Sequence, residues 1–224
     1  MSQPDPFRIT TVAALRERIG EPNPATRQKV FERLDEQMVA FLARAPICLL
    51  ATSDPEGNLE VSPKGDRPGF VLVEDDGTLL LPDRKGNKLI FGLQNLLANP
   101  RVGLIFLVPG TDETLRVNGR AELRADPDLL ARLGARGQPA LVAIRVRVER
   151  CFFHCARAFL RAELWNQDSW PERQRVSFGR QLAPRLGGDA ALAEQIDAAI
   201  EKGRGTSNSA PHPQALKTRD CHRR

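Results

Sequence analysis

The stretch LLLPDRKGNKLIFGLQNLLANP, residues 79–100, decides the fold because three kinds of segment follow one another within it. An apolar run ends in a proline, a basic turn with Arg84, Lys85 and Lys88 follows, and apolar residues then return at helical spacing. This order predicts a strand, a turn and a helix over about 88–98. The start of a helix carries partial positive charge, so these cations either face water or bind an anion.

Short apolar or alternating runs on both sides of this stretch predict six or seven strands, mostly joined by hairpin-length turns such as DPEGN and EDDGT. Such connections favour a small closed antiparallel barrel, mainly β with flanking helices. RVGLIFLV and GTLLLP are apolar on both faces, so their second face needs a helix or a partner subunit. We expect a homodimer for that reason. The predicted strands are PICLLATS, LEVSP, GFVLVE, GTLLLP, RVGLIFLV, TLRVNGRAEL and ALVAIRVRVERCFFHC.

Helical periodicity precedes and follows the predicted strands. Residues 25–43 predict one helix with Asn23 as its cap and Pro24 in its first turn. Five apolar residues share one face of that helix: Val30, Leu34, Met38, Phe41 and Leu42. Further helices are predicted at 156–164, about 171–183 and about 189–202. The chain is thus divided into an N-terminal extension (1–24), a barrel domain with its helix (25–155), a helical segment (156–202) and a disordered basic tail (203–224).

The composition is that of a soluble globular protein, with 224 residues, 41% of them apolar and 27% charged. No apolar run approaches the roughly 18 residues of a membrane span, and the N-terminus lacks the apolar core of a signal peptide. The four scattered cysteines are expected to be reduced thiols in the cytoplasm. Most of the net charge of +5 lies in residues 203–224, so nucleic-acid binding is not expected.

Two basic turns point to an anion-binding cleft. In PDRKGNK, Gly86 allows close approach of the backbone and Asn87 is a favoured helix cap. The second turn, in EVSPKGDRPGFV, adds Lys64 and Arg67 at the end of a strand. Free N–H groups at a helix start together with cations form a phosphate or carboxylate site.

Two other groups of residues support weaker interpretations. In TLRVNGRAEL, Arg116 and Asn118 share one face of a strand, which is either solvent-exposed or part of the cleft. Cys151, His154 and Cys155 lie close together, but three ligands fall short of the usual four of a structural zinc site. We therefore expect core thiols and no metal.

The chain resembles the flavin-binding split β-barrels of the pyridoxamine 5′-phosphate oxidase superfamily over roughly residues 25–170. The residues that carry the resemblance are VSPKGDRPGFV, LPDRKGNK, ANPRVGLIFLVPG and ETLRVNGRAE, in that order, together with the later FFHCARAFLRAELW, which fits an uncharacterised branch. The resemblance implies FMN in a cleft at a homodimer interface, and a role in FMN-dependent oxidoreduction.

Carried over by position, the resemblance assigns seven cofactor-binding residues. Arg84 and Lys88 would hold the flavin phosphate, with Asn87 capping the helix beside them. Ser62 and Lys64 would contact the flavin or its ribityl chain. Arg116 and Asn118 would face the same cleft from either subunit, and Arg116 or Lys64 would stabilise the reduced flavin.

The resemblance leaves the catalytic residues and the reaction partner open. The oxidases' C-terminal Arg-x-His segment has no counterpart in TRDCHRR, so oxidation of vitamin B6 itself is not expected. The other reactant is expected to be a small molecule or a second redox cofactor. The alternatives are a non-catalytic flavin-nucleotide binding or storage module, and a binder of pyridoxal phosphate or a deazaflavin on the same fold.

Overall fold

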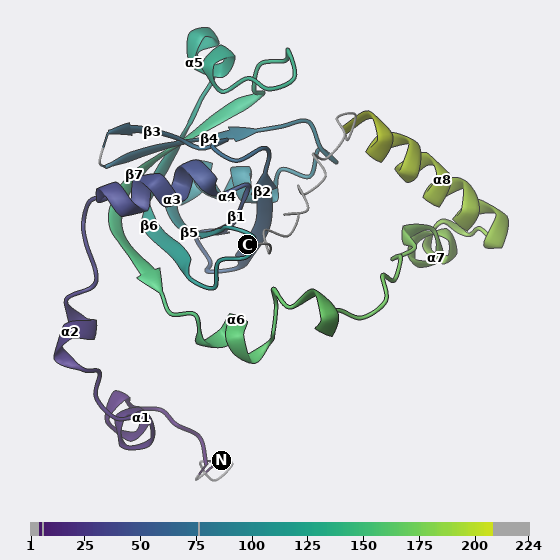
Figure 1. Cartoon of the computed structure of the whole chain (residues 1–224). Coiled ribbons are helices and arrows are strands. Elements are labelled where there is room, and N and C mark those ends of the chain that lie inside the picture. Colours follow the sequence, from purple (N-terminus) through teal and green to yellow (C-terminus); the bar gives the residue numbers. More distant parts are fainter. Residues whose placement is uncertain (1–4, 6, 76, 208–224) are drawn as a thin grey trace, which may run out of the picture. The chain divides into compact units, whose positions relative to one another are not determined.

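The computed structural model describes residues 5, 7–75 and 77–207, and the chain divides after Trp170 into two compact units (Figure 1). The segment expected to be helical over 156–202 therefore belongs to both units. The last helix continues to Ser207, past the boundary predicted at 202. Residues 208–224, most of the predicted basic tail, lie outside the described part. None of the described helices is long and apolar enough to cross a membrane.

The first unit is built on a seven-stranded antiparallel sheet in the order β2-β1-β5-β6-β7-β4-β3, which forms a split β-barrel. All seven predicted strands are confirmed. Their bounds are β1 Ile47–Ser53, β2 Leu59–Gly65, β3 Leu72–Asp75, β4 Thr78–Asp83, β5 Arg101–Leu107, β6 Thr114–Arg124 and β7 Val142–His154.

A β-bulge lets the two long strands, β6 and β7, bend around the barrel. Their register shifts between Asn118 and Gly119. A Cβ atom at Gly119 would lie 2.0 Å from the carbonyl oxygen of Arg147, so only glycine fits this close approach.

The helix predicted over 25–43 is wrong in its middle. α2 (Pro24–Arg27) is a single turn, capped by Asn23 as predicted, and α3 (Glu36–Arg44) begins only after Asp35, whose side chain accepts a hydrogen bond from Met38 N. Between them, Phe31 exchanges two backbone hydrogen bonds with Cys151 of β7. These bonds anchor the segment to the sheet, and a continuous helix could not form them.

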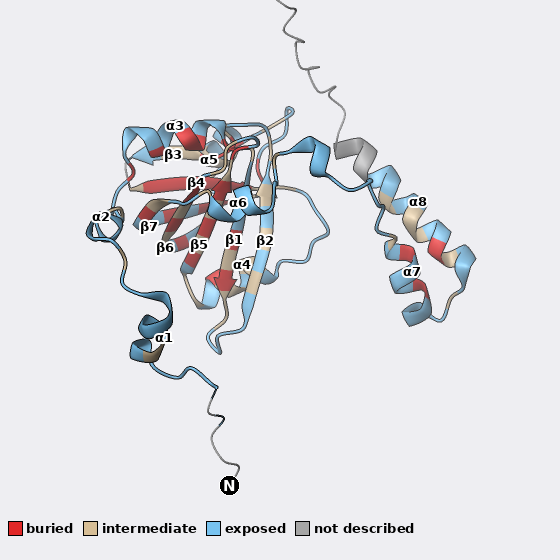
Figure 2. Cartoon of the chain, turned by 60° about the horizontal axis from the view of Figure 1, so that its bottom comes forward, coloured by how far each residue is buried: buried red, intermediate tan, exposed pale blue. Residues whose placement is uncertain are grey.

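Two apolar clusters cover the two faces of β4. Leu79 and Leu81 belong to the main core, together with Met38, Phe41 and Leu42 of α3. Leu80, between them, packs on the opposite face in a smaller cluster whose residues come from β3, α5 (Pro127–Arg132), β7 and the α5–β7 connection. A helix that the sequence did not predict therefore covers the second face of GTLLLP. Figure 2 shows the buried residues concentrated on the strands and α3, whereas α1 (Val12–Ile19) and α2 have no buried residue.

Helix α4 (Phe91–Ala98) packs on β1, β2 and β6, and Leu96 of its inner face is in the core. After β7 the chain forms α6 (Arg157–Arg161) and the short 3-10 turn η1 (Gln167–Ser169). These elements complete the first unit.

The second unit contains α7 (Phe178–Leu182), the 3-10 turn η2 (Ala183–Leu186) and α8 (Ala190–Ser207). Asp197 of α8 accepts hydrogen bonds from the Ser177 hydroxyl and from Gly179 N, which hold the start of α7 against α8. Ser177 also caps α7 by accepting from Arg180 N. The helix predicted near 189–202 is confirmed.

Candidate functional site

A large cavity of the barrel, here called the main cavity, has a volume of about 740 Å³. It is lined by residues 60–65 of β2, by the turn 82–90 and by the first residues of α4, with Leu50 and Leu141 contributing from β1 and the segment before β7. Five of the seven predicted site residues line it: Ser62, Lys64, Arg84, Asn87 and Lys88. The two basic turns that the sequence singled out thus meet at one cavity.

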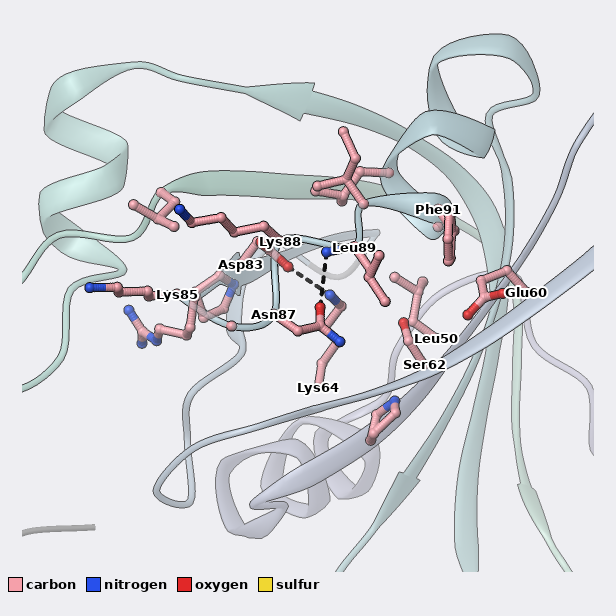
Figure 3. Close-up of a pocket in the computed structure, with 18 of the residues that line it drawn as sticks. Leu50, Glu60, Ser62, Lys64, Asp83, Lys85, Asn87, Lys88, Leu89 and Phe91 are labelled. Atoms are coloured by element: carbon pink, nitrogen blue, oxygen red, sulfur yellow. Dashed lines mark hydrogen bonds and ion pairs between the residues drawn. The ribbon is translucent and has the colours of Figure 1, made fainter. Parts of the chain in front are cut away.

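Lys64 is fixed by an ion pair within the chain. Its Nζ lies 2.6 Å from Oδ1 of Asp83, and the two side chains are 21% and 17% exposed. The pair joins the end of β2 to the end of β4 (Figure 3). The ammonium group of Lys64 is therefore held in place at the cavity wall.

Arg84 is fixed as well, but by residues outside the main cavity. Its Nε donates to Asp66 Oδ2 at 3.0 Å and its Nη1 donates to the carbonyl oxygen of Leu133 at 2.6 Å. Both acceptors line a second, neighbouring cavity and not the main one. The guanidinium group thus connects three segments of the barrel.

Lys85 and Lys88 differ from these two cations. Within the part of the chain that the structure describes, neither amine has a hydrogen-bond or ion-pair partner, and both residues are exposed. In Figure 3 their side chains lie at one end of the cavity, well away from Glu60 and Phe91. Lys88 has φ of 64°, a left-handed conformation that is uncommon for a residue other than glycine and recurs at functional sites.

The predicted role of Asn87 as a helix cap is wrong. The helix begins at Phe91 rather than at about 88, and its cap residue, Ile90, provides no side-chain hydrogen bond. The Asn87 side chain instead accepts from Leu89 N at 2.9 Å, which closes a tight turn (Figure 3). The first backbone N–H groups of α4, beside the cavity, therefore have no side-chain acceptor among the residues that the structure describes.

The other end of the main cavity is apolar with a few polar groups. Leu50, Leu89 and Phe91 lie there, near the Ser62 hydroxyl and the Glu60 carboxylate (Figure 3). Large apolar side chains remain exposed around the cavity: Leu89, Ile90, Phe91 and Leu141. This end suits a flat, largely apolar group that carries a few hydrogen-bonding atoms.

Arg116 and Asn118 lie on the outer face of β6 and do not line the main cavity of their own chain. The Arg116 guanidinium lies 5.4 Å from the centroid of the Phe152 ring, and Lys29 Nζ lies 5.2 Å from the same centroid. The Asn118 side chain lines a separate cavity, where its Oδ1 is buried without a hydrogen-bond partner among the described residues. Their contribution to a cleft from a partner subunit stays a prediction.

The Cys151, His154 and Cys155 cluster is spread over different environments. Cys151 is buried, its thiol donates to the carbonyl oxygen of Arg33 at 3.1 Å, and burial raises its pKa to about 11. Cys155 is exposed. Burial, and then the charges of Arg116 and Lys29, lower the pKa of His154. No group of three or more potential metal ligands occurs among the described residues.

Among the lining residues to which the sequence assigned no role are Glu60, Lys85, Phe91 and Leu141. Lys85 stood in the singled-out PDRKGNK run but was not assigned a role. Leu141 lies far along the chain and enters the cavity because Leu141 N bonds to the carbonyl oxygen of Asp83 at 3.0 Å. No local pattern reveals such a pairing.

The structure thus defines a split β-barrel with a cation-lined cavity. The sequence profile of the family described as pyridoxamine 5′-phosphate oxidase matches residues 34–155, more than half of the chain. The chain belongs to this family, whose members bind flavin or related cofactors. No curated protein matches the chain.

Several solved structures are similar to this chain. A putative pyridoxamine 5′-phosphate oxidase from Lactobacillus delbrueckii is 26% identical, covering 55% of this chain and 95% of that one, with a TM-score of 0.43. HupZ from Group A Streptococcus is 18% identical, covering 54% of this chain and 93% of that one, with a TM-score of 0.44. A protein described as F420 reductase is 25% identical, covering 53% and 98%, with a TM-score of 0.40. These TM-scores are low, so family membership rests on the match to residues 34–155.

Proposed function

We propose that this protein binds FMN in the main cavity and acts as an FMN-dependent oxidoreductase on a small molecule or a second redox cofactor. The observation that carries the proposal is the placement of Lys85 and Lys88, two cations without partners in the described chain, at one end of a cavity whose other end is apolar. A flavin nucleotide has the same division, with a phosphate at one end and an aromatic ring system at the other.

The described residues fit this cofactor in size and chemistry. A volume of about 740 Å³ lies within the usual range for ligand cavities, roughly 300–1,000 Å³. A Cβ atom added at Gly86, between the lysines, would meet nothing within 4 Å, so there is room for a group beside that backbone. The first turn of α4, without a side-chain cap, offers further N–H donors.

Different residues of the cavity would hold different parts of the cofactor. Lys85 and Lys88 would bind the phosphate, as point charges on flexible stems. The Ser62 hydroxyl and the fixed Lys64 ammonium would orient the remaining polar atoms, while Leu50 and Phe91 exclude water from the ring. Bound FMN supplies two-electron transfer at its N5 atom. A fixed cation such as Lys64 stabilises negative charge at little reorganisation cost.

We also propose a homodimer, because one apolar face of the sheet is not covered by the described residues of the first unit. Ile47, Leu49, Leu59 and Val61 of β1 and β2 are all exposed, and the facing residues of β5 are only half-buried. α5 covers the second face of β4, but Ile47, Leu49, Leu59 and Val61 stay exposed within the first unit. A second copy would bury the patch. Val61→Asp should then shift the protein towards a monomer in sedimentation, whereas Leu186→Asp in the helical unit should not; a monomeric native protein would contradict the proposal.

The experiment that tests the cofactor is the absorption spectrum of the freshly purified protein, with the released ligand identified by mass. Flavin bands and the mass of FMN would support the proposal. A deazaflavin or pyridoxal phosphate absorbs at other wavelengths and would reassign the cavity. A colourless protein that fails to take up added FMN would refute it.

A non-catalytic flavin-binding or storage module would need the same cavity. Reduction of the bound flavin by a nicotinamide nucleotide, followed by its reoxidation, separates the two functions. Turnover supports the oxidoreductase. A bound flavin that none of the common electron donors reduces would favour storage.

A further inference from the structure

The described residues of the helical unit, which follows Trp170, bury no large apolar side chain. Those that are buried are Gly179, Ala183 and Ala193, all of them small, and Figure 2 shows only short buried stretches on α7 and α8. A Cβ atom added at Gly179 would overlap the carbonyl oxygen of Ala193, so the two helices already lie as close as glycine allows. Two short helices with so small an interior gain little stability from their own packing, and a further contact is expected.

Large apolar side chains form a row on the outside of this unit, here called the α7 row. It consists of Val176, Phe178, Leu182 and Leu186, all of which are exposed. Phe178 and Leu182 lie four residues apart in α7 and therefore on the same side of that helix, and Leu186 follows in η2. Apolar side chains that gather in this way commonly mark a surface for contact with another protein.

The charges of the unit show what such a surface would fit. Residues 176–188, which carry the α7 row, contain Arg180 and Arg185 and no acidic residue. Residues 189–201, at the start of α8 and along it, contain four acidic residues and no basic one. One unit thus presents both a basic apolar edge and an acidic helix. Two copies related by two-fold symmetry can place each basic edge against the acidic helix of the other.

Contacts inside the unit leave some of these charges for a partner. Asp189 accepts hydrogen bonds from the first N–H groups of α8, and Asp197 accepts from the start of α7. Glu201 pairs with Arg175. Glu194 and Arg185, by contrast, have no ion-pair partner among the residues that the structure describes.

We propose that the helical units of two copies pair through their α7 rows, with Arg185 facing Glu194 of the partner subunit. The inference rests on the proposed homodimer, because the four side chains of the row fall well short of the roughly 800 Å² per partner that a stable complex buries. The exposed sheet faces would hold the two copies together. The high effective concentration within that dimer then allows the weaker helical contact to form.

Amide hydrogen exchange across α7 and α8 of the full-length protein measures the pairing, and sedimentation reads the oligomeric state of the same samples. Leu182→Asp places a charge in the α7 row and should speed exchange about tenfold or more, while the protein remains a dimer. Val61→Asp, in the sheet, should speed exchange as much, because a monomer has no second helical unit. The double variant should exchange no faster than either single one. Ala199→Asp, at an exposed residue of α8 outside the row, is the matched control and should exchange as the native protein does.

Charge reversal tests which surfaces meet. Arg185→Glu should speed exchange severalfold, because it would face the partner's Glu194 with a like charge. Adding Glu194→Arg should return exchange to the native rate, since the exchanged charges are again complementary. A double variant that exchanges faster than Arg185→Glu alone would overturn the pairing as argued.

Two other exchange patterns would also overturn the inference. If Leu182→Asp speeds exchange and Val61→Asp does not, the α7 row is covered by its own chain. If neither variant changes exchange, the row faces water. Either pattern in a dimeric native protein refutes the pairing alone, whereas a native protein that sediments as a monomer refutes the homodimer as well.

Discussion

Two pairs of cations near the main cavity have opposite surroundings. Lys64 and Arg84 are partly buried and each bonds a carboxylate of the same chain, Asp83 and Asp66 respectively. Lys85 and Lys88, one and four residues after Arg84, are exposed and lack such partners within the described chain. Arg84 and Lys85 are thus neighbouring cations of one turn with different surroundings.

The difference follows from the cost of burying charge. A partly buried cation must be paired, because an unpaired charge loses its hydration without compensation. Once paired, it fixes the chain segments that it joins. An exposed lysine keeps its hydration and can exchange it for an anionic ligand at small cost. We infer that the paired cations shape the cavity and the unpaired ones bind.

The largest effect is expected for ligand affinity. The double variant Lys85→Ala/Lys88→Ala should lower FMN affinity by about a hundredfold or more, since it removes two charge-assisted contacts to a phosphate. Its midpoint of urea unfolding without ligand should match that of the native protein. Fluorescence titration measures the affinity. Unchanged FMN affinity would contradict the inference that the unpaired lysines bind the ligand whereas the paired cations shape the cavity.

Arg84→Ala should have the reverse profile. The largely buried Asp66 carboxylate and the Leu133 carbonyl oxygen would lose their partner, so the free energy of unfolding should fall by about 2 kcal/mol. FMN affinity should change less than in the lysine double variant. Urea denaturation measures the first quantity.

Asp66→Asn provides the control for Arg84, because it removes the buried charge but keeps a hydrogen-bonding side chain. In the background of Asp66→Asn, Arg84→Ala should cost less than it does alone. Equal costs in both backgrounds would show that the pair contributes nothing, and the shaping role would be wrong for Arg84.

Lys64→Gln should have a smaller effect, because both members of its pair are more exposed to water than Asp66 is. We expect a loss of about 1 kcal/mol in the free energy of unfolding. FMN affinity should fall severalfold, since a fixed charge leaves the cavity wall. If Lys64→Gln lowered FMN affinity as much as the lysine double variant does, Lys64 would be a binding cation and not a shaping one.

The sequence predicted the sheet well because its signals are local. Every strand contains an apolar or alternating run between turn residues, and that pattern identified it. The helix over 25–43 was wrong because apolar spacing at Val30 and Leu34 mimicked a helix, while Phe31 bonds to Cys151, which lies 120 residues away in the chain. Tertiary hydrogen bonds outweighed the local pattern.

The candidate site was predictable as a set of charges but not as a set of pairs. PDRKGNK identified the turn, and nothing within it separates Arg84 from Lys85. The separation comes from Asp66 and Leu133, which lie 18 and 49 residues from Arg84. The start of α4 was misplaced because Asn87, a good cap residue, uses its oxygen in a turn to Leu89. Partners that distant lie beyond any local sequence pattern.

The smallest expected effect concerns a carboxylate that holds two helices together rather than pairing with a cation at the cavity. The Ser177 hydroxyl, and then Gly179 N, lower the pKa of Asp197 from its ordinary 3.8. Because the folded-state pKa is the lower one, this interaction stabilises the helical unit fully above the unfolded-state pKa. Its contribution is lost as the pH falls through the folded-state pKa, below 3.8.

Amide hydrogen exchange at Gly179 and Arg180 in the full-length protein measures this effect. Asp197→Asn should speed exchange relative to the native protein near pH 5, after correction for intrinsic rates, and the difference should shrink below pH 3.8. Ser177→Ala should give part of the same change, because the hydroxyl both caps α7 and donates to Asp197. A difference that persists undiminished in acid would mean that Asp197 acts through packing and not through its charge, which would separate it from the charged pairs of the barrel.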